Sequence, residues 1–355
     1  MSSVNVDVLC VGLGPAGACA AAAAAAGGAR VLAVDRKREA GRPVQCAELV
    51  PGLIGVEVEG LAACVRQAID AMETFVEGEA PDVTRPFPGR MLDRGAFDAQ
   101  LVAAALRAGA DCRFGVSVCG IARDGVVPLS NGARVAARVV VGADGPRSAV
   151  GRAIGSVNRE LVETRQVTVP LLERHAATDI FLSASIPGGY AWLFPKGDVA
   201  NLGAGVEPAG KSRLKALVAR LHADLAAAGR VGREVLAQTG GAIPVGGALA
   251  PRGRLGASEV LLAGDAAGLA NPITGAGIAA AAQSGTLAGE AAARASRGER
   301  GALDDYEDEI DAIFGPALAR ALQRRHALLH SAATPADLRR AWIAYPEYWS
   351  PGARP

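Results

Sequence analysis

The sequence has 355 residues, enough for one large or two smaller domains, and half of them are hydrophobic, which allows a sizeable buried core. There are 37 lysines and arginines and 36 acids, and the net charge is +1. The composition therefore shows neither the basic surface of a nucleic-acid-binding protein nor an acidic tail. We expect a globular protein that does not bind nucleic acid.

Six cysteines occur within the first 119 residues, without a Cys-x-x-Cys pair or a metal-ligand spacing. We expect reduced thiols and no metal site. His326 and His330 share a helix face, but no glutamate lies between them. The sequence begins without a basic region, apolar stretch and cleavage site. Its longest apolar run, Ala16 to Ala26, is far shorter than the ~20 residues that a bilayer requires. These features predict a cytoplasmic protein without a membrane span.

The stretch from Asp7 to Arg36 carries the strongest local signal. An apolar run meets the turn GLGPAG (residues 12–17), continues as an alanine-rich segment, and ends in a second apolar run before Asp35. This order predicts a strand, a tight turn, a helix and a parallel strand. The first glycine permits the turn, Gly14 lets the backbone approach a pyrophosphate, and Gly17 lets helix and strand pack closely. Asp35 can accept hydrogen bonds from a ribose. The stretch therefore predicts a dinucleotide site.

Two further strands end in glycine motifs. Val135 to Val141 is a largely apolar strand that runs into Gly142-Ala143-Asp144-Gly145, and Glu259 to Ala263 runs into Gly264-Asp265. The second motif is followed by Asn271 to Gly277 and by a helix of small residues to about Ala295. After Asp98, the spacing of Leu101, Val102, Ala105 and Leu106 predicts a helix that ends near Gly109, and the alternation from Cys112 to Cys119 predicts a strand.

Between Ser156 and Val245 the sequence changes to short alternating runs, which predict an antiparallel sheet. The runs are Gln166 to Leu171, Asp179 to Ile186, Tyr190 to Phe194 and Val199 to Val206, and weak alternation also occurs at Glu73 to Glu77. A helix from Ser212 to Ala228 interrupts them, and the chain is helical again from Asp304. The predicted fold is thus α/β, with a Rossmann-like domain interleaved with an α+β substrate part.

We expect residues 1–51, 90–155 and 246–300 to form the nucleotide-binding domain. Residues 52–89 and 156–245 would form a substrate-binding domain built on the antiparallel sheet, and residues 301–355 a C-terminal helical segment. Because ligands of doubly wound folds bind outside the carboxyl ends of the strands, the three glycine motifs should lie together.

With these three motifs, the sequence from Val4 to Ala295 resembles the flavoprotein superfamily of p-hydroxybenzoate hydroxylase, and within it most closely the geranylgeranyl reductases. The resemblance implies FAD as cofactor, with its ADP part at the glycine turn and Asp35. It implies that Asp93-Arg94 supports the pyrophosphate and that Asp265 contacts the ribityl region. The cofactor-binding residues expected in this way are Gly12, Gly14, Pro15, Ala16, Gly17, Asp35, Arg36, Cys46, Ala47, Arg94, Asp144, Gly264, Asp265, Pro272, Gly275, Ala276 and Gly277.

The segment from Pro272 to Gly277 would then pass the flavin ring. A glycine-rich turn at a helix N-terminus suits this place, because reduced flavin carries negative charge there.

Two segments resemble the reductases more than the hydroxylases. Tyr190-Ala191-Trp192-Leu193-Phe194-Pro195-Lys196 is similar to the reductase motif YxWxFPK. Residues 43–48, PVQCAE, are similar to the reductase loop that commonly reads CGE, with Ala47 in place of the glycine. The aromatic residues of the first segment share one strand face, where they either line an apolar pocket or belong to the core of the sheet. Cys46 is either a filler or, in its charged loop, a reactive thiol. The pattern around Lys196 predicts a hairpin turn.

The resemblance implies an FAD-dependent reductase that saturates carbon–carbon double bonds in an isoprenoid chain. Tyr190 and Trp192 would hold the alkene, and Cys46 would deliver a proton or align the substrate. The electrons would come from either NAD(P)H or a ferredoxin-like protein, and the sequence does not distinguish between these two donors. An isoprenoid substrate would also bring the protein into contact with the membrane surface.

Two alternatives stay open at this point. One is an FAD-dependent monooxygenase that hydroxylates an aromatic or polyketide-like compound, because it would use the same FAD motifs. The other is a non-enzymatic prenyl-binding protein of the same fold.

Overall fold

The strand, tight turn, helix and parallel strand predicted at the start of the chain are present. The structure is a computed structural model that describes residues 3–51, 61–121, 124–299, 301–330 and 334–350. In it, β1 (Ser3–Val11) leads through the glycine turn into α1 (Pro15–Ala26) and then into β2 (Val31–Asp35), which pairs with β1 in parallel. Residues 8–11 of β1 and 31–34 of β2 are buried, as expected for strands covered on two faces, whereas Val4 and Val6 are only partly buried.

A seven-stranded sheet extends this unit in the order β17-β18-β10-β1-β2-β8, with β9 paired to β10. The added strands are β8 (Asp111–Phe114), β9 (Val127–Pro128), β10 (Arg134–Gly142), β17 (Arg252–Leu255) and β18 (Ser258–Leu262). The strand predicted at Cys112 to Cys119 is shorter than expected. It ends at Phe114 because Gly115 turns the chain with a φ of 72°.

The carboxyl ends of the parallel strands bring the three glycine motifs together. The backbone N–H of Gly12 donates to the carbonyl of Val34 at 2.8 Å, and that of Ala143 donates to the carbonyl of Val11 at 2.8 Å. The N–H of Ala263 donates to Gly142 at 3.0 Å. The predicted meeting of the three motifs at one sheet edge is therefore observed.

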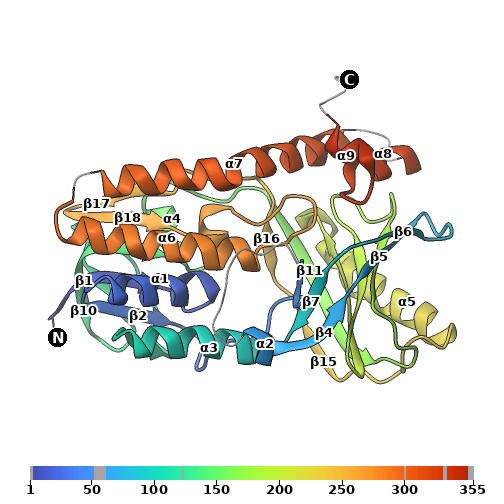
Figure 1. The fold of residues 1–355 in the computed structure, drawn as a ribbon, viewed down its shortest axis with the longest axis horizontal. Helices are drawn as coiled ribbons and strands as arrows, with labels where there is room; N and C mark the ends of the chain where they lie inside the picture. The colour runs from blue at the N-terminus through green and yellow to red at the C-terminus, as the bar shows by residue number, and fades with distance from the viewer. Residues whose placement is uncertain (1–2, 52–60, 122–123, 300, 331–333, 351–355) are drawn as a thin grey trace.

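Helices α1 and α6 (Ile278–Ser296) pack directly on each other over this sheet (Figure 1). Their contact is unusually close because small residues face each other. A Cβ on Gly285 would lie 2.1 Å from the carbonyl oxygen of Ala16, and one on Gly289 would lie 2.3 Å from that of Ala20. The small-residue composition of both segments thus follows from the packing of two backbones. Helix α3 (Arg94–Arg107) covers the neighbouring part of the same layer.

An eight-stranded sheet carries the aromatic segment, in the order β15-β11-β14-β13-β12-β5-β6 with β16 paired to β11. Its strands are β5 (Ala71–Val76), β6 (Asp82–Thr84), β11 (Leu161–Pro170), β12 (Ala177–Leu182), β13 (Ala191–Lys196), β14 (Val199–Val206), β15 (Ala237–Thr239) and β16 (Ala242–Pro244). The pairing is antiparallel as predicted, except that β5 and β12 run parallel. No hairpin joins those two strands, because β5 enters from a separate segment of the chain.

The two faces of this sheet differ because side chains alternate along β13. Leu193 belongs to a core under α5 (Leu214–Ala227), whereas Trp192 and Phe194 pack on the opposite face. The helix predicted from Ser212 starts at Leu214, since the turn before it, Pro208–Arg213, is a 3₁₀ helix.

A small sheet and the C-terminal helices join the two large sheets. β3 (Leu49–Pro51) and β4 (Val65–Ile69) both pair with β7 (Gly89–Leu92). The long helix α7 (Ala302–Leu329) runs along α6 and reaches the eight-stranded sheet, where α8 (Pro335–Ala341) and α9 (Pro346–Trp349) follow (Figure 1).

The shorter elements are α2 (Leu61–Cys64), α4 (Ala149–Ala153) and the 3₁₀ turn Gly264–Ala267. Within the described part of the chain, no helix has both the length and the apolar character needed to cross a bilayer.

Candidate active site

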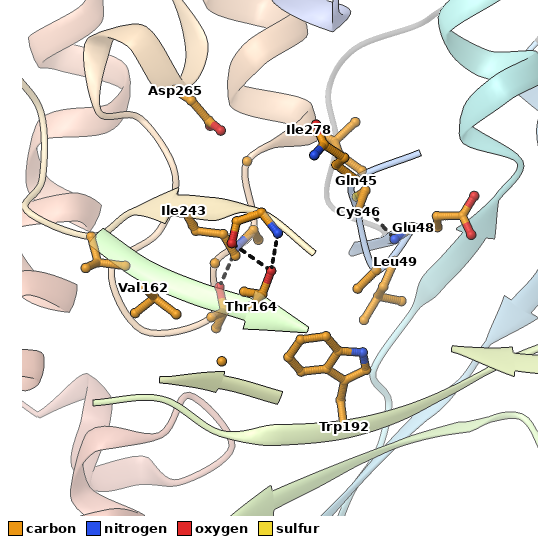
Figure 2. Close-up of a pocket in the computed structure, with 18 of the residues that line it drawn as sticks. Gln45, Cys46, Glu48, Leu49, Val162, Thr164, Trp192, Ile243, Asp265 and Ile278 are labelled. Atoms are coloured by element: carbon orange, nitrogen blue, oxygen red, sulfur yellow. Dashed lines mark hydrogen bonds between the residues drawn. The ribbon is translucent and has the colours of Figure 1, made fainter. Parts of the chain in front are cut away.

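A cavity of about 330 Å³ lies where the carboxyl edge of the first sheet faces the aromatic side of the second. Figure 2 shows its walls. Asp265 points into it from one side and Trp192 lies opposite. The loop with Cys46 forms one flank, and Val162, Thr164 and Ile243 form the other.

The glycine turn forms one end of this cavity. Gly14, Pro15 and Ala16 line it, and a Cβ on Gly14 would meet no heavy atom within 4 Å beyond its chain neighbours. Gly12 and Gly17 do not line the cavity. Gly12 has a φ of 99°, and a Cβ on Gly17 would lie 1.8 Å from the carbonyl oxygen of Gly12. The turn therefore leaves open space beside Gly14 alone, which fits a ligand that approaches the backbone there.

Four other residues expected near the cofactor lie outside the cavity lining. The two carboxylate oxygens of Asp35 accept hydrogen bonds from the N–H groups of Leu13 at 2.7 Å and Lys37 at 2.8 Å. Asp144 accepts from the N–H of Ala149 at 2.6 Å and so caps α4. Arg36 is exposed, and Gly264 packs against Ala16 and Ala281.

Opposite charges face the middle of the cavity. Arg94 is partly buried and forms a bidentate ion pair with Asp98, at 2.9 and 3.0 Å. Burial alone would lower the pKa of Arg94, but the neighbouring Cys46 and Asp98 raise it above its ordinary value. Burial raises the pKa of Asp265 to about 6, and the positive charge of Arg94 only partly opposes this shift.

The shift of Asp265 predicts a pH dependence for the flavin-free protein. Because its pKa is raised from 3.8 to about 6, folding favours the protonated acid, and the free energy of unfolding falls as the pH rises through this interval. We expect Asp265→Asn to be more stable than the wild type by up to ~3 kcal/mol at about pH 7.5, and by only ~1 kcal/mol at about pH 4.5. Urea titrations at both pH values measure this difference. Equal differences at the two values would contradict the assignment.

The segment from Pro272 to Gly277 borders the same space. Pro272, Gly275, Ala276 and Gly277 all line the cavity, just before α6 begins at Ile278. The side-chain oxygen of Asn271 accepts from the N–H groups of Ile273 at 2.9 Å and Thr274 at 3.0 Å, which fixes the turn.

Aromatic side chains form the wall across the cavity. Tyr190, Trp192 and Phe194 lie on one face as predicted, with ring centroids 5.7 and 6.0 Å apart along the row. They are both core and cavity wall, because Trp192 and Phe194 are almost fully buried and still line the cavity. The hydroxyl of Tyr190 donates to the carbonyl of Thr274 at 2.6 Å, which connects this wall to the segment beside α6. Burial raises the pKa of Tyr190, so its hydroxyl stays protonated.

The cysteine loop forms the flank between the two walls. Cys46 and Ala47 both line the cavity. The sulfur of Cys46 accepts from the N–H of Glu48 at 3.2 Å, and its carbonyl accepts from Gln166 Nε2 at 3.2 Å. Gln166 in turn accepts from the indole N–H of Trp192 at 3.2 Å. The loop and the aromatic wall therefore share a hydrogen-bonded partner.

Sequence reasoning missed several lining residues. Trp342, after α8, packs on Tyr190 with ring centroids 4.9 Å apart, yet no motif marks it. Thr164 and Gln166 lie on β11, where alternation predicts a strand but not which face meets a ligand. Met72 and Phe87 come from the region without assigned chemistry. Glu48 is the one residue of this group that the sequence indicates, because it belongs to the cysteine loop at residues 43–48.

Comparisons with known proteins identify the family to which a chain with this cavity belongs. The family model for the geranylgeranyl reductase catalytic domain matches residues 161–242. Digeranylgeranylglycerophospholipid reductase 3 of Methanosphaera stadtmanae is 30% identical over 93% of this chain and 89% of its own length. Digeranylgeranylglycerophospholipid reductase 1 of Methanothermobacter thermautotrophicus is 33% identical over 92% and 87%.

A solved structure is similar over nearly the whole chain. The geranylgeranyl bacteriochlorophyll reductase-like protein of Thermoplasma acidophilum superposes with a TM-score of 0.85 at 25% identity, covering 97% of this chain and 92% of that one. The reductases that match do so along most of their length, and the matched catalytic domain contains the aromatic strand β13. The chain therefore belongs to the geranylgeranyl reductase family of FAD-dependent oxidoreductases.

Proposed function

We propose that this enzyme saturates carbon–carbon double bonds in the isoprenoid chains of a lipid, because its relatives are named digeranylgeranylglycerophospholipid reductases. The observation that carries the proposal is the cavity itself, where an aromatic wall faces the glycine turn with the cysteine loop between them. An apolar chain suits such a wall, because the exposed lining is mostly carbon.

The residues at the glycine end fit FAD. The open space beside Gly14 admits a pyrophosphate close to the backbone, and the N-terminus of α1 adds its positive dipole. Arg94 and Asp265 would hold the polar chain of the cofactor, and residues 272–277 would border its ring system. Residues 1–51, 90–155 and 246–300 would together form the cofactor-binding domain. When bound and reduced, FAD supplies the hydride for the double bond.

The opposite walls would hold the substrate. Trp192 and Tyr190 provide rigid apolar surface for the alkene, and the hydrogen bond from Tyr190 to Thr274 keeps this surface in register with residues 272–277. Saturation adds a hydride to one carbon and a proton to the other. The thiol of Cys46, on the flank between both walls, would hold and donate that proton.

The reaction also needs a source of electrons and access to the lipid. NAD(P)H and a ferredoxin-like protein are both compatible with a chain that shows one dinucleotide turn in its sequence. We place the enzyme in the cytoplasm and propose that it contacts the membrane surface, because its lipid substrate resides there.

Analysis of the product tests the proposal against the monooxygenase alternative. The FAD-loaded enzyme, reduced with dithionite, is incubated without oxygen with a lipid that carries geranylgeranyl chains. We expect each reacted double bond to gain two hydrogen atoms, measured by mass spectrometry. If the product instead gains an oxygen atom, and forms only when oxygen is admitted, the protein would be a monooxygenase and the reductase proposal would be wrong.

A further inference from the structure

The carboxylate of Glu48 is a buried charge that the proposed reaction does not use. Glu48 is the last residue of the cysteine loop and is only 5% exposed. Its φ of 69° lies in the left-handed region, which is rare for a residue with a side chain. Figure 2 shows its side chain directed away from the space between Asp265 and Trp192. A buried acid held in such a conformation requires specific partners.

Three donors from three different elements bind this carboxylate. The ammonium group of Lys196 lies 2.6 Å from Oε2, Asn201 Nδ2 lies 2.8 Å from the same oxygen, and the N–H of Arg94 donates to Oε1 at 3.1 Å. Asn201 also donates to the carbonyl of Ala47 at 3.2 Å. The end of the cysteine loop is thereby fastened to β13, β14 and the start of α3.

The position of Lys196 connects this network to the substrate wall. Lys196 is the last residue of β13, the strand that carries Trp192 and Phe194. Its side chain is 18% exposed, so water weakens its pairing with Glu48 only partly. A buried ion pair adds little net stability compared with apolar residues, and in some proteins its role is instead to specify how the elements that it joins are placed.

We propose that Glu48 and Lys196 are positioning residues, which hold the Cys46 thiol in register with the aromatic wall of β13. This inference rests on the proposed function. Cys46 and Trp192 come from segments far apart in the sequence, and the amide of Gln166 also connects them. Without the ion pair, the loop would keep the hydrogen bonds made by Gln166 and Asn201 but lose its direct contact with the end of β13.

Three variants and one control test the role of the pair. Lys196→Met keeps the apolar stem but leaves the charge of Glu48 buried and unpaired, whereas Lys196→Arg keeps a cation at this place. The double variant Glu48→Gln with Lys196→Met removes both charges, so we expect it to fold even if the single variant does not. Arg113→Met is the matched control, because it breaks an exposed ion pair with Asp111 outside the cavity.

Two readouts are measured per flavin-loaded molecule. We expect Lys196→Met and the double variant to lower kcat for the geranylgeranyl lipid by about 10- to 100-fold with little change in KM, because the thiol is misplaced. We also expect iodoacetamide to label Cys46 roughly fivefold faster in both, as quantified on the Cys46 peptide. Lys196→Arg should recover most of the turnover, and Arg113→Met should match the wild type.

The labelling experiment needs no substrate, so it separates this inference from the proposed function. A wild-type enzyme that does not reduce the lipid would refute the function but not the positioning role. Unchanged labelling of Cys46 in the double variant would overturn the positioning role. The positioning role would also be overturned if the loss of activity were explained entirely by a smaller amount of folded, flavin-loaded protein.

Discussion

The variant Gly14→Val should fold but bind FAD at least about 100-fold more weakly than the wild type, a loss of ~2.7 kcal/mol. The reason is steric. The backbone of Gly14 has a φ of −73°, which valine tolerates, and a Cβ there projects into open space beside the cavity. The added side chain would therefore occupy the place of the pyrophosphate without straining the chain.

Flavin absorbance of the purified protein and its titration with FAD measure the effect, and thermal unfolding confirms the fold. Gly14→Ala serves as a graded control, since its single methyl group should weaken binding less. Full flavin content in Gly14→Val would show that the cofactor lies elsewhere.

Cys46→Ala should lower turnover by about 100-fold, the lower range for loss of a positioned acid, while flavin content and unfolding temperature stay close to those of the wild type. The thiol lies on a loop at the cavity and contributes little to the core, so its removal should affect the reaction and not the fold. Rapid-reaction kinetics with the geranylgeranyl lipid measure the change.

Cys46→Ser is the matched control, because it keeps the size of the side chain and a weaker proton donor. It should retain more activity than Cys46→Ala. Unimpaired turnover per folded molecule in Cys46→Ala, together with a large loss of stability, would show instead that Cys46 is a filler.

The parallel part of the fold could be predicted because its determinants are local. The turn at residues 12–17 requires glycine at Gly12 and Gly17 for contacts within a few residues or with one neighbouring strand. Buried parallel strands also appear as continuous apolar runs. Since ligands of such sheets bind at the carboxyl ends of the strands, the three glycine motifs are expected at one edge, and they lie there.

The sequence predicts less where distant segments meet. The parallel pairing of β5 with β12 joins residues about a hundred positions apart. The alternation of side chains along a strand does not indicate which distant strand it pairs with. Trp342 completes the aromatic wall from the C-terminal helices for the same reason. The pattern around Lys196 indicates only a turn, because the carboxylate that binds it, Glu48, comes from a loop 148 positions earlier.

The roles assigned to individual side chains remain predictions. The structure brings Cys46, Trp192, Arg94 and Asp265 to one cavity. It places Arg36 and Asp144 outside the lining, and Asp144 has a capping role that its motif did not reveal. A motif therefore indicates the region of a site more reliably than the direction of a given side chain.

Anaerobic reoxidation of the reduced enzyme is the most direct test of the reductase assignment. The dithionite-reduced, FAD-loaded protein is mixed without oxygen with a geranylgeranyl lipid, and in parallel with its fully saturated counterpart, while flavin absorbance is followed. We predict that the absorbance of oxidised flavin returns with the unsaturated lipid and not with the saturated one. If neither lipid reoxidised the flavin, and reoxidation occurred only after oxygen was admitted, the account of this protein as an isoprenoid reductase would be contradicted.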